Sequence, residues 1–209
     1  RGFEALRMVA EADAAYQKVL RDATNDVGLL AQGADFYRRA GRDAEAQTYY
    51  ERLLDPALAA PPDIVVQARR HLAVLLATSS KGRALELLDA NKKTRGDTVA
   101  DLRILLFIES LTPASRETAL AKFQDSLRLQ PPTPEERVLL ARMLEAAGYR
   151  GQARTQLAEA VAESPRSAEF LVPYVRLLIQ AEDWDEARRL TTRLEQLEPG
   201  TERVKTLRK

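Results

Sequence analysis

Two consecutive segments, at residues 134–167 and 168–201, carry similar residue types at offsets of 34 positions. Ala153 and Pro165 in the first segment recur as Ala187 and Pro199 in the second. A fixed period of this length is typical of a helical solenoid, in which each repeat contributes a pair of helices. The period therefore predicts an all-α solenoid of helix–turn–helix repeats.

The same period divides the rest of the chain. It predicts a single solenoid over residues 1–209, which consists of a half repeat at 1–26, repeats at 27–64, 65–99, 100–133, 134–167 and 168–201, and a partial helix at 202–209. Gly41 predicts the end of a first helix, because glycine readily adopts the positive φ found at helix C-termini. Residues 55–62 contain three prolines and lengthen the first full repeat, so we expect a longer loop there.

Helix starts are marked by capping residues. Thr133, Pro134 and Glu136 combine an N-cap hydroxyl, a proline at the first helical position and a glutamate three residues after the cap. This pattern predicts a reciprocal capping box that satisfies two backbone amides. Further N-caps are expected at Asp63, Asp97, Ser167 and Asp183.

Each predicted second helix has an alanine at one fixed position and usually an aromatic or other large residue four positions later. The alanines are Ala12, Ala46, Ala84, Ala119, Ala153 and Ala187, and the later residues are Tyr16, Tyr50, Leu88, Phe123, Leu157 and Thr191. In these positions the chain resembles the tetratricopeptide repeat (TPR) family, whose 34-residue helix pairs have small residues where the helices cross. An alanine- and arginine-rich composition favours a bacterial TPR-containing protein.

The chain also departs from the TPR pattern. Phe107 and Val175 occupy a first-helix position that normally has a small residue, and Gly33 occupies one that is usually large. Pro173 lies inside a predicted helix, where it removes one backbone hydrogen bond. We expect the solenoid to bend at these positions.

The resemblance to TPR proteins implies a right-handed α-solenoid with a concave groove lined by the first helices. The groove positions that we predict to bind a partner are Arg70, Ile104, Ile108, Val138, Arg142, Val172, Arg176 and Ile179. The apolar members would accept an amphipathic helix or an extended peptide, and the arginines would bind acidic groups at the rim. The alternative is that the apolar residues pack against neighbouring helices and the arginines are merely solvated.

The composition argues against several classes of function. The 32 basic and 31 acidic residues give a formal net charge of +1, which provides no long-range attraction to nucleic acid or an anionic membrane. Cysteine is absent and His71 is the only histidine, so thiolate metal sites and histidine-based catalytic triads are not expected. We predict no catalytic, cofactor-binding or metal-binding residue.

The sequence favours a structural role, and not a functional one, for two further residues. His71 is interpreted as a residue on the flank of a helix rather than a ligand or a base. Trp184 begins a predicted helix and is expected to pack between repeats, although an exposed tryptophan would indicate a contact surface.

These patterns predict a non-enzymatic scaffold that binds a peptide or a helix of a partner protein in its concave groove. The alternative is a self-assembly or intramolecular-packing module of a larger protein whose catalytic or membrane part is absent. The chain starts with Arg1 rather than methionine, so we expect a fragment whose targeting signal lies elsewhere. Its apolar runs are too short to cross a bilayer. The sequence does not distinguish cytoplasm from periplasm and does not define an oligomeric state.

Overall fold

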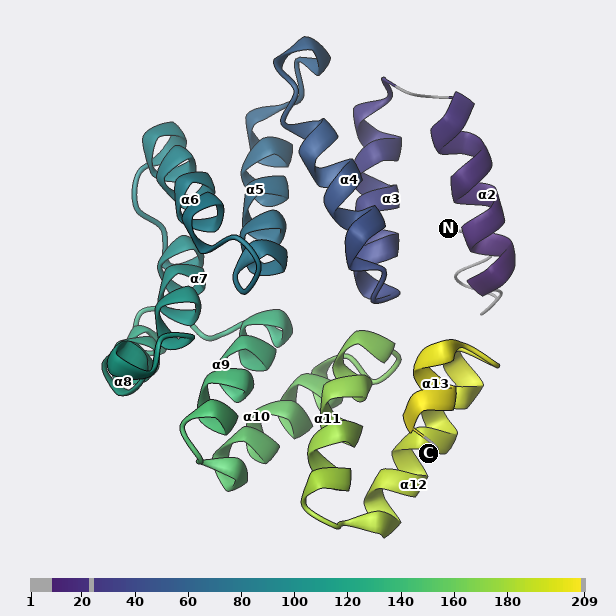
Figure 1. The fold of residues 1–209 in the computed structure, drawn as a ribbon, viewed down its shortest axis with the longest axis vertical. Coiled ribbons are helices and arrows are strands. Elements are labelled where there is room, and N and C mark those ends of the chain that lie inside the picture. Colours follow the sequence, from purple (N-terminus) through teal and green to yellow (C-terminus); the bar gives the residue numbers. More distant parts are fainter. Residues whose placement is uncertain (1–8, 23–24, 208–209) are drawn as a thin grey trace. The chain divides into compact units, whose positions relative to one another are not determined.

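The computed structural model describes residues 9–22 and 25–207, which form helices joined by turns (Figure 1). The chain divides into two compact units. The central unit is Val19–Pro131, and the C-terminal unit is Pro132–Lys209 together with Arg1–Lys18. Within the described ranges, no helix combines the length and apolar character needed to cross a membrane.

The central unit consists of three helix pairs that follow the last residues of α2 (Val9–Asp22). Each first helix packs against its own second helix, and the second helix then contacts the first helix of the next pair. The first helices α5 and α7 also contact each other. The elements are α3 (Val27–Arg39), α4 (Asp43–Leu53), η1 (Pro56–Leu58), α5 (Pro62–Leu76), α6 (Lys81–Arg95), α7 (Val99–Ser110), η2 (Pro113–Ser115) and α8 (Arg116–Ser126).

The C-terminal unit repeats this arrangement with two helix pairs and one short helix. The second helix α10 contacts both α9 and α11, and the first helices α9 and α11 contact each other. The elements are α9 (Pro134–Ala146), α10 (Arg150–Glu163), α11 (Ala168–Gln180), α12 (Trp184–Leu197) and α13 (Glu202–Leu207). The predicted all-α class, built from helix–turn–helix repeats, is confirmed.

The repeated alanines are buried in the helical packing. None of them exposes more than 4% of its surface, and the large residue four positions later is buried in every case. Alanine is needed at such positions because a longer side chain would separate the two backbones. Phe107 and Val175, at the departures from the small-residue pattern, are buried as well.

Gly33 provides space for a neighbouring side chain. A Cβ atom at this position would lie 2.6 Å from Cδ1 of Leu20. Leu20, near the end of α2, thus fills the volume that a large residue at position 33 occupies in the usual TPR pattern. Pro173 lies inside α11, which remains helical from Ala168 to Gln180.

A buried arginine joins the helices of the α7–α8 pair. Arg103 on α7 exposes none of its surface, and its Nε donates to Ser126 Oγ at 2.9 Å. Its Nη2 donates to the carbonyl oxygens of Ser126, at 3.0 Å, and Gln130, at 2.5 Å. Carbonyls at the end of a helix carry partial negative charge, so the guanidinium stabilises the C-terminus of α8.

The capping predictions were partly right. Thr133 and Glu136 form the expected reciprocal box, with N–O distances of 2.9 and 3.3 Å.

The Asp63 prediction was wrong, because the prolines start α5 one residue earlier and Pro61 is its N-cap. The Asp97 prediction was also wrong: Thr98 is the N-cap of α7, and its hydroxyl accepts from the Asp101 amide. Ser167 is an N-cap that makes no side-chain capping bond, and Asp183 accepts from Glu186 N at 3.4 Å.

Among the residues that the structure describes, two other than glycine adopt the left-handed backbone conformation. Glu182 has a φ of 57° at the end of α11, where Gly41 and Gly148 serve the same purpose after α3 and α9. Ala59, with a φ of 47°, lies in the loop after η1. Each of these conformations costs an L-residue about 1–2 kcal/mol relative to a right-handed one.

Candidate functional site

The predicted binding residues of the central unit take part in internal packing. Arg70 forms a bidentate ion pair with Asp101, with N–O distances of 2.9 and 2.8 Å. Ile104 is 7% exposed and Ile108 is fully buried. The charge of Arg70 is therefore already neutralised within the unit, and little of the two isoleucines is available to a partner.

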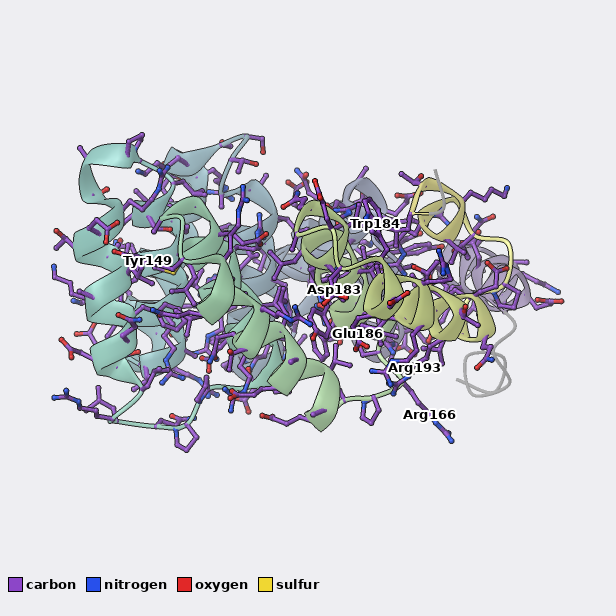
Figure 2. The ribbon with its side chains drawn as sticks, turned by 90° about the horizontal axis from the view of Figure 1, so that it is seen from below. Tyr149, Arg166, Asp183, Trp184, Glu186 and Arg193 are labelled. Atoms are coloured by element: carbon purple, nitrogen blue, oxygen red, sulfur yellow. The ribbon has the colours of Figure 1, made fainter. Side chains whose placement is uncertain are left out.

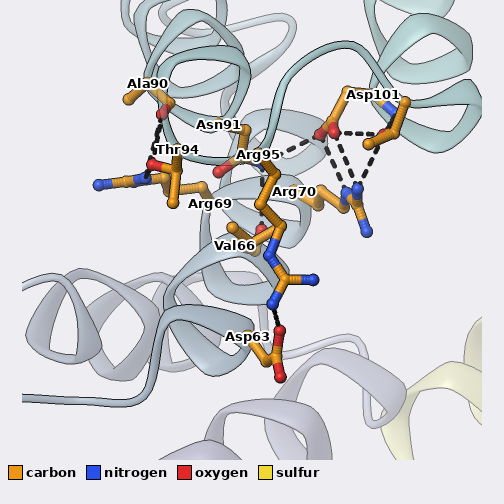
Figure 3. A network of polar contacts seen from close by, with 10 residues as sticks. Asp63, Val66, Arg69, Arg70, Ala90, Asn91, Thr94, Arg95 and Asp101 are labelled. Carbon is orange, nitrogen blue, oxygen red and sulfur yellow. Dashed lines mark hydrogen bonds and ion pairs between the residues drawn. The ribbon is translucent and has the colours of Figure 1, made fainter.

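Asp101 is the centre of a polar network that joins α5, α6 and α7 (Figure 3). Besides Arg70, it accepts from Thr98 Oγ1 at 2.5 Å and from Asn91 Nδ2 at 2.9 Å. Burial acts to raise the pKa of Asp101, but the hydrogen bonds from Arg70, Thr98 and Asn91 outweigh it and hold the pKa below its usual value. Asn91 also donates to Val66 O at 3.2 Å.

The same region has a second set of contacts that extend along α6 (Figure 3). Arg69 Nη1 donates to Ala90 O at 3.3 Å and to Thr94 Oγ1 at 3.1 Å, and Arg95 pairs with Asp63. These contacts bind α5 to the last turns of α6. The Asp101 network and its neighbours therefore fix how the two helix pairs pack, and these contacts are structural.

A smaller polar cluster lies where α3, α4 and α5 meet. The Tyr50 hydroxyl donates to Asp35 Oδ1 at 2.6 Å, and His71 Nε2 lies 4.0 Å from the same oxygen. The rings of Tyr50 and His71 stack with centroids 5.3 Å apart. Burial, with the nearby positive charge of Arg38, lowers the pKa of His71 to about 4, so its imidazole is neutral at pH 7.

This cluster was not apparent from the sequence. Tyr50 matches the large residue expected in a second helix, and His71 gives no sign by spacing that its ring stacks on a tyrosine. The burial and the aspartate raise the pKa of Tyr50 well above its usual value, so it stays a hydrogen-bond donor. The hydrogen bond from Tyr50 and the nearby His71 ring orient the half-exposed Asp35 carboxylate.

The predicted binding residues of the C-terminal unit have a different environment. Arg142 on α9 and Arg176 on α11 are exposed, Val138 and Ile179 are half-buried, and Val172 is buried. Arg142 and Arg176 occupy the same position in successive first helices, as do Val138 and Val172, and α9 contacts α11. These five residues are called the α9–α11 face. It places arginine side chains beside partly accessible apolar side chains.

Trp184 does not pack between repeats, so that expectation was wrong. It is 55% exposed at the first position of α12, directly after the N-cap Asp183 (Figure 2). Asp183 is held in place by an ion pair with Arg154 on α10, at 2.7 Å. Tyr149, the N-cap of α10, is 44% exposed. In the parts of the chain that the structure describes, no group of three histidine, aspartate or glutamate side chains could hold a metal ion.

Comparisons with known proteins agree with the helix–turn–helix repeats described above. The family model for the tetratricopeptide repeat matches residues 144–209. No curated protein matches the chain in sequence. Among solved structures, a tetratricopeptide repeat protein from Parabacteroides merdae is similar with a TM-score of 0.64 and 16% identity, over 98% of this chain and 78% of that one.

A second similar structure is PilW, a type IV pilus biogenesis factor. Its TM-score is 0.53 at 16% identity, over all of this chain (100%) and 94% of PilW. At such low identity these structures show the fold, and the family match supplies the sequence relationship for the C-terminal region. The chain has the fold of tetratricopeptide repeat proteins, and its residues 144–209 match the family model for the tetratricopeptide repeat.

Proposed function

We propose that this chain is a non-catalytic protein-interaction scaffold and that it binds a peptide or a helix of a partner protein along the α9–α11 face. The observation that carries this proposal is the pair of exposed arginines, Arg142 and Arg176, at equivalent positions of adjacent first helices. Val138 and Ile179 lie beside them with part of their apolar surface accessible. A basic rim around apolar side chains suits an amphipathic partner with acidic residues.

The spacing of packed helices suggests what the partner must present. Axes of helices in contact lie about 8–10 Å apart, and we take about that distance as the spacing of the Arg142 and Arg176 backbones across the face. In an extended peptide with polyproline II geometry, residues i and i+3 lie on the same side about 9 Å apart, and in a helix residues i and i+7 lie on the same side about 10 Å apart. We therefore expect acidic residues at one of these two spacings, with an apolar residue between them.

The remaining predicted residues have a lesser part in this proposal. Arg70 is paired with Asp101, and Ile104 and Ile108 are buried, so the partner contacts assigned to them stay predictions. Val172 is the buried member of the face, so we assign it no direct contact with the partner. The proposal is thus limited to the α9–α11 face.

The test is a selection of displayed random peptides on the wild-type chain, followed by measurement of the selected peptides on variants. Binding of acidic peptides should be lost in the double variant Arg142→Glu/Arg176→Glu. Arg150→Glu/Arg166→Glu makes the same charge change at exposed sites outside α9 and α11, and should bind as the wild type does. Circular dichroism checks that each variant is folded.

Two results would contradict the proposal. One is the selection of peptides without acidic residues, and the other is unchanged binding by the Arg142→Glu/Arg176→Glu variant. Light scattering of the same samples tests the alternative function. A wild-type oligomer that dissociates in this variant would assign the α9–α11 face to self-assembly instead.

A further inference from the structure

Glu145 is a half-buried residue of α9 at the edge of the α9–α11 face. It lies three residues after Arg142, and residues at this spacing are neighbours on one side of a helix, with Cβ atoms about 5–6 Å apart. The equivalent position of the next repeat, 34 residues later, is Ile179, which is a member of the face. A carboxylate therefore stands beside one of the two arginines, at a position where α11 has an apolar side chain.

The charges around Glu145 come from two helices. Arg142 on α9 itself and Arg150 at the start of α10 both attract the carboxylate, but the effect of burial is larger, so the pKa of Glu145 is raised above its usual value. The other helix packed against α9 is α11, which has the uncharged Ile179 at the equivalent position and Arg176 three residues before it. The negative charge of Glu145 thus lies within a group of arginines and reduces the positive potential of the face.

We propose that Glu145 limits the affinity of the α9–α11 face for acidic segments, and that loss of its negative charge, by protonation or in Glu145→Gln, tightens their binding. This inference rests on the proposed function. The carboxylate of Glu145 competes with those of the partner for Arg142 and also repels them. A neutral side chain at this position removes both effects, while Arg142 and Arg176 keep their charges.

The sign of the pH dependence follows from this competition. Protonated Glu145 binds the acidic segment more tightly, so the affinity should increase as the pH falls from 7 to 5. Coupling between two binding events is reciprocal, so the bound segment should in turn favour the protonated form of Glu145. Burial moves this protonation to a higher pH than that of an exposed glutamate, because it raises the pKa.

The first test measures the affinity of the acidic peptides selected on the wild type, at pH 7. Glu145→Gln should bind them about threefold more tightly, which is the size of one charge–charge interaction at a partly exposed site. Glu198→Gln is the matched control, because Glu198 is also a half-buried carboxylate of the C-terminal unit but is the C-cap of α12. It should bind as the wild type does.

The second test compares pH 7 with pH 5. The acidic residues of the peptide are replaced by cysteic acid, whose sulfonate stays ionised over this range. The wild type should bind more tightly at pH 5, and Glu145→Gln should show a smaller change. Glu198→Gln should respond as the wild type does, although burial raises the pKa of Glu198 as well. His71 makes little contribution, because its pKa in the folded chain is about 4.

The inference is overturned if Glu145→Gln binds no more tightly than Glu198→Gln, or if the affinities of the wild type and Glu145→Gln change equally with pH. Peptides that need Arg142 and Arg176 but do not respond to Glu145→Gln overturn this inference alone. Binding that survives Arg142→Glu/Arg176→Glu contradicts the proposed function. If no acidic peptide is selected, both are overturned.

Discussion

The two units of this protein bury different kinds of side chain between their helices. The central unit encloses Asn91, Asp101 and Arg103, each held by several hydrogen bonds to neighbouring helices. Among the described residues of the C-terminal unit, the buried polar side chains are Glu136, in a capping box, and Thr191, which bonds to its own helix. The family model matches only within the C-terminal unit.

This difference shows two ways of joining helix pairs. Contacts between alanines and large apolar residues require only size and shape, so they can repeat with the period of the fold. A buried polar network requires specific partners on specific helices, so it departs from the repeat pattern where it occurs. The predictions below test this contrast, beginning with the largest expected effect.

Replacing Arg103 with methionine should destabilise the protein by about 3 kcal/mol, because the carbonyls at the end of α8 would lose a buried, charged donor. Denaturant unfolding measures the change. Arg137→Met in the C-terminal unit is the matched comparison, since Arg137 also joins a first helix to a second through Glu159 and Glu163 but is less buried. Its loss should cost only about 1 kcal/mol. If both variants lose the same unfolding free energy, the two units do not differ in how strongly a buried arginine stabilises them.

Replacing Ala153 with leucine should destabilise the C-terminal unit by about 2 kcal/mol, since the added volume has no space at a fully buried helix crossing. Ala162→Leu, at an exposed position of the same helix, is the control and should be nearly neutral. The two variants can be compared by thermal unfolding. If Ala153→Leu unfolds at the same temperature as the wild type, the helices do not cross at the position that the repeat register predicts.

Acid should weaken the central unit through His71. The pKa of His71 is about 4 in the folded chain and 6.5 for an unperturbed histidine, so between these values the unfolded state binds more protons. The contribution of the neutral histidine to stability is present above pH 6.5 and falls as the pH drops towards 4; between pH 7 and pH 5 the loss is about 1–2 kcal/mol. Denaturant unfolding at pH 7, 6 and 5 measures it. His71→Gln should show a smaller loss over this range, and an equal loss would assign the effect to other groups.

Replacing Glu182 with glycine should stabilise the C-terminal unit by about 0.5–1 kcal/mol, since glycine adopts a positive φ without steric cost. Gly148→Ala makes the opposite change at the equivalent turn after α9 and should destabilise by a similar amount. Thermal unfolding of both variants tests the pair. A destabilised Glu182→Gly protein would indicate that the glutamate side chain makes a compensating contact.

The sequence predicted the features that depend on short-range signals. The capping box at Thr133 needs only residues three positions apart, and the buried alanines follow directly from the helical period. At Asp97, two possible N-caps were adjacent, and Thr98 was preferred because its hydroxyl faces the amide of Asp101. Spacing along the chain does not rank such neighbours.

The features that could not be predicted depend on how helices are rotated against one another. Arg70 and Asp101 are 31 residues apart, and only the packing of α5 against α7 brings them together. The repeat position of Arg70 was compatible with a place on the solvent-facing rim of the groove. In the structure, the Asp101 carboxylate on α7 pairs with the Arg70 guanidinium and holds it away from solvent. The prediction that Trp184 packs between repeats failed for a related reason. The sequence indicates that Trp184 begins a helix, but it does not indicate in which direction the side chain points.

The loop after α4 has a practical consequence for engineering. It contains a single 3-10 turn, capped by Asp55 through the Ala57 amide at 2.9 Å, and residues 55–57 are exposed. Ala59 follows in its left-handed conformation, while α4 and α5 on either side contact each other directly. The covalent link here contributes little to the packing that surrounds it. This loop is accordingly the natural position at which to insert a label or to divide the gene into two fragments that reassemble.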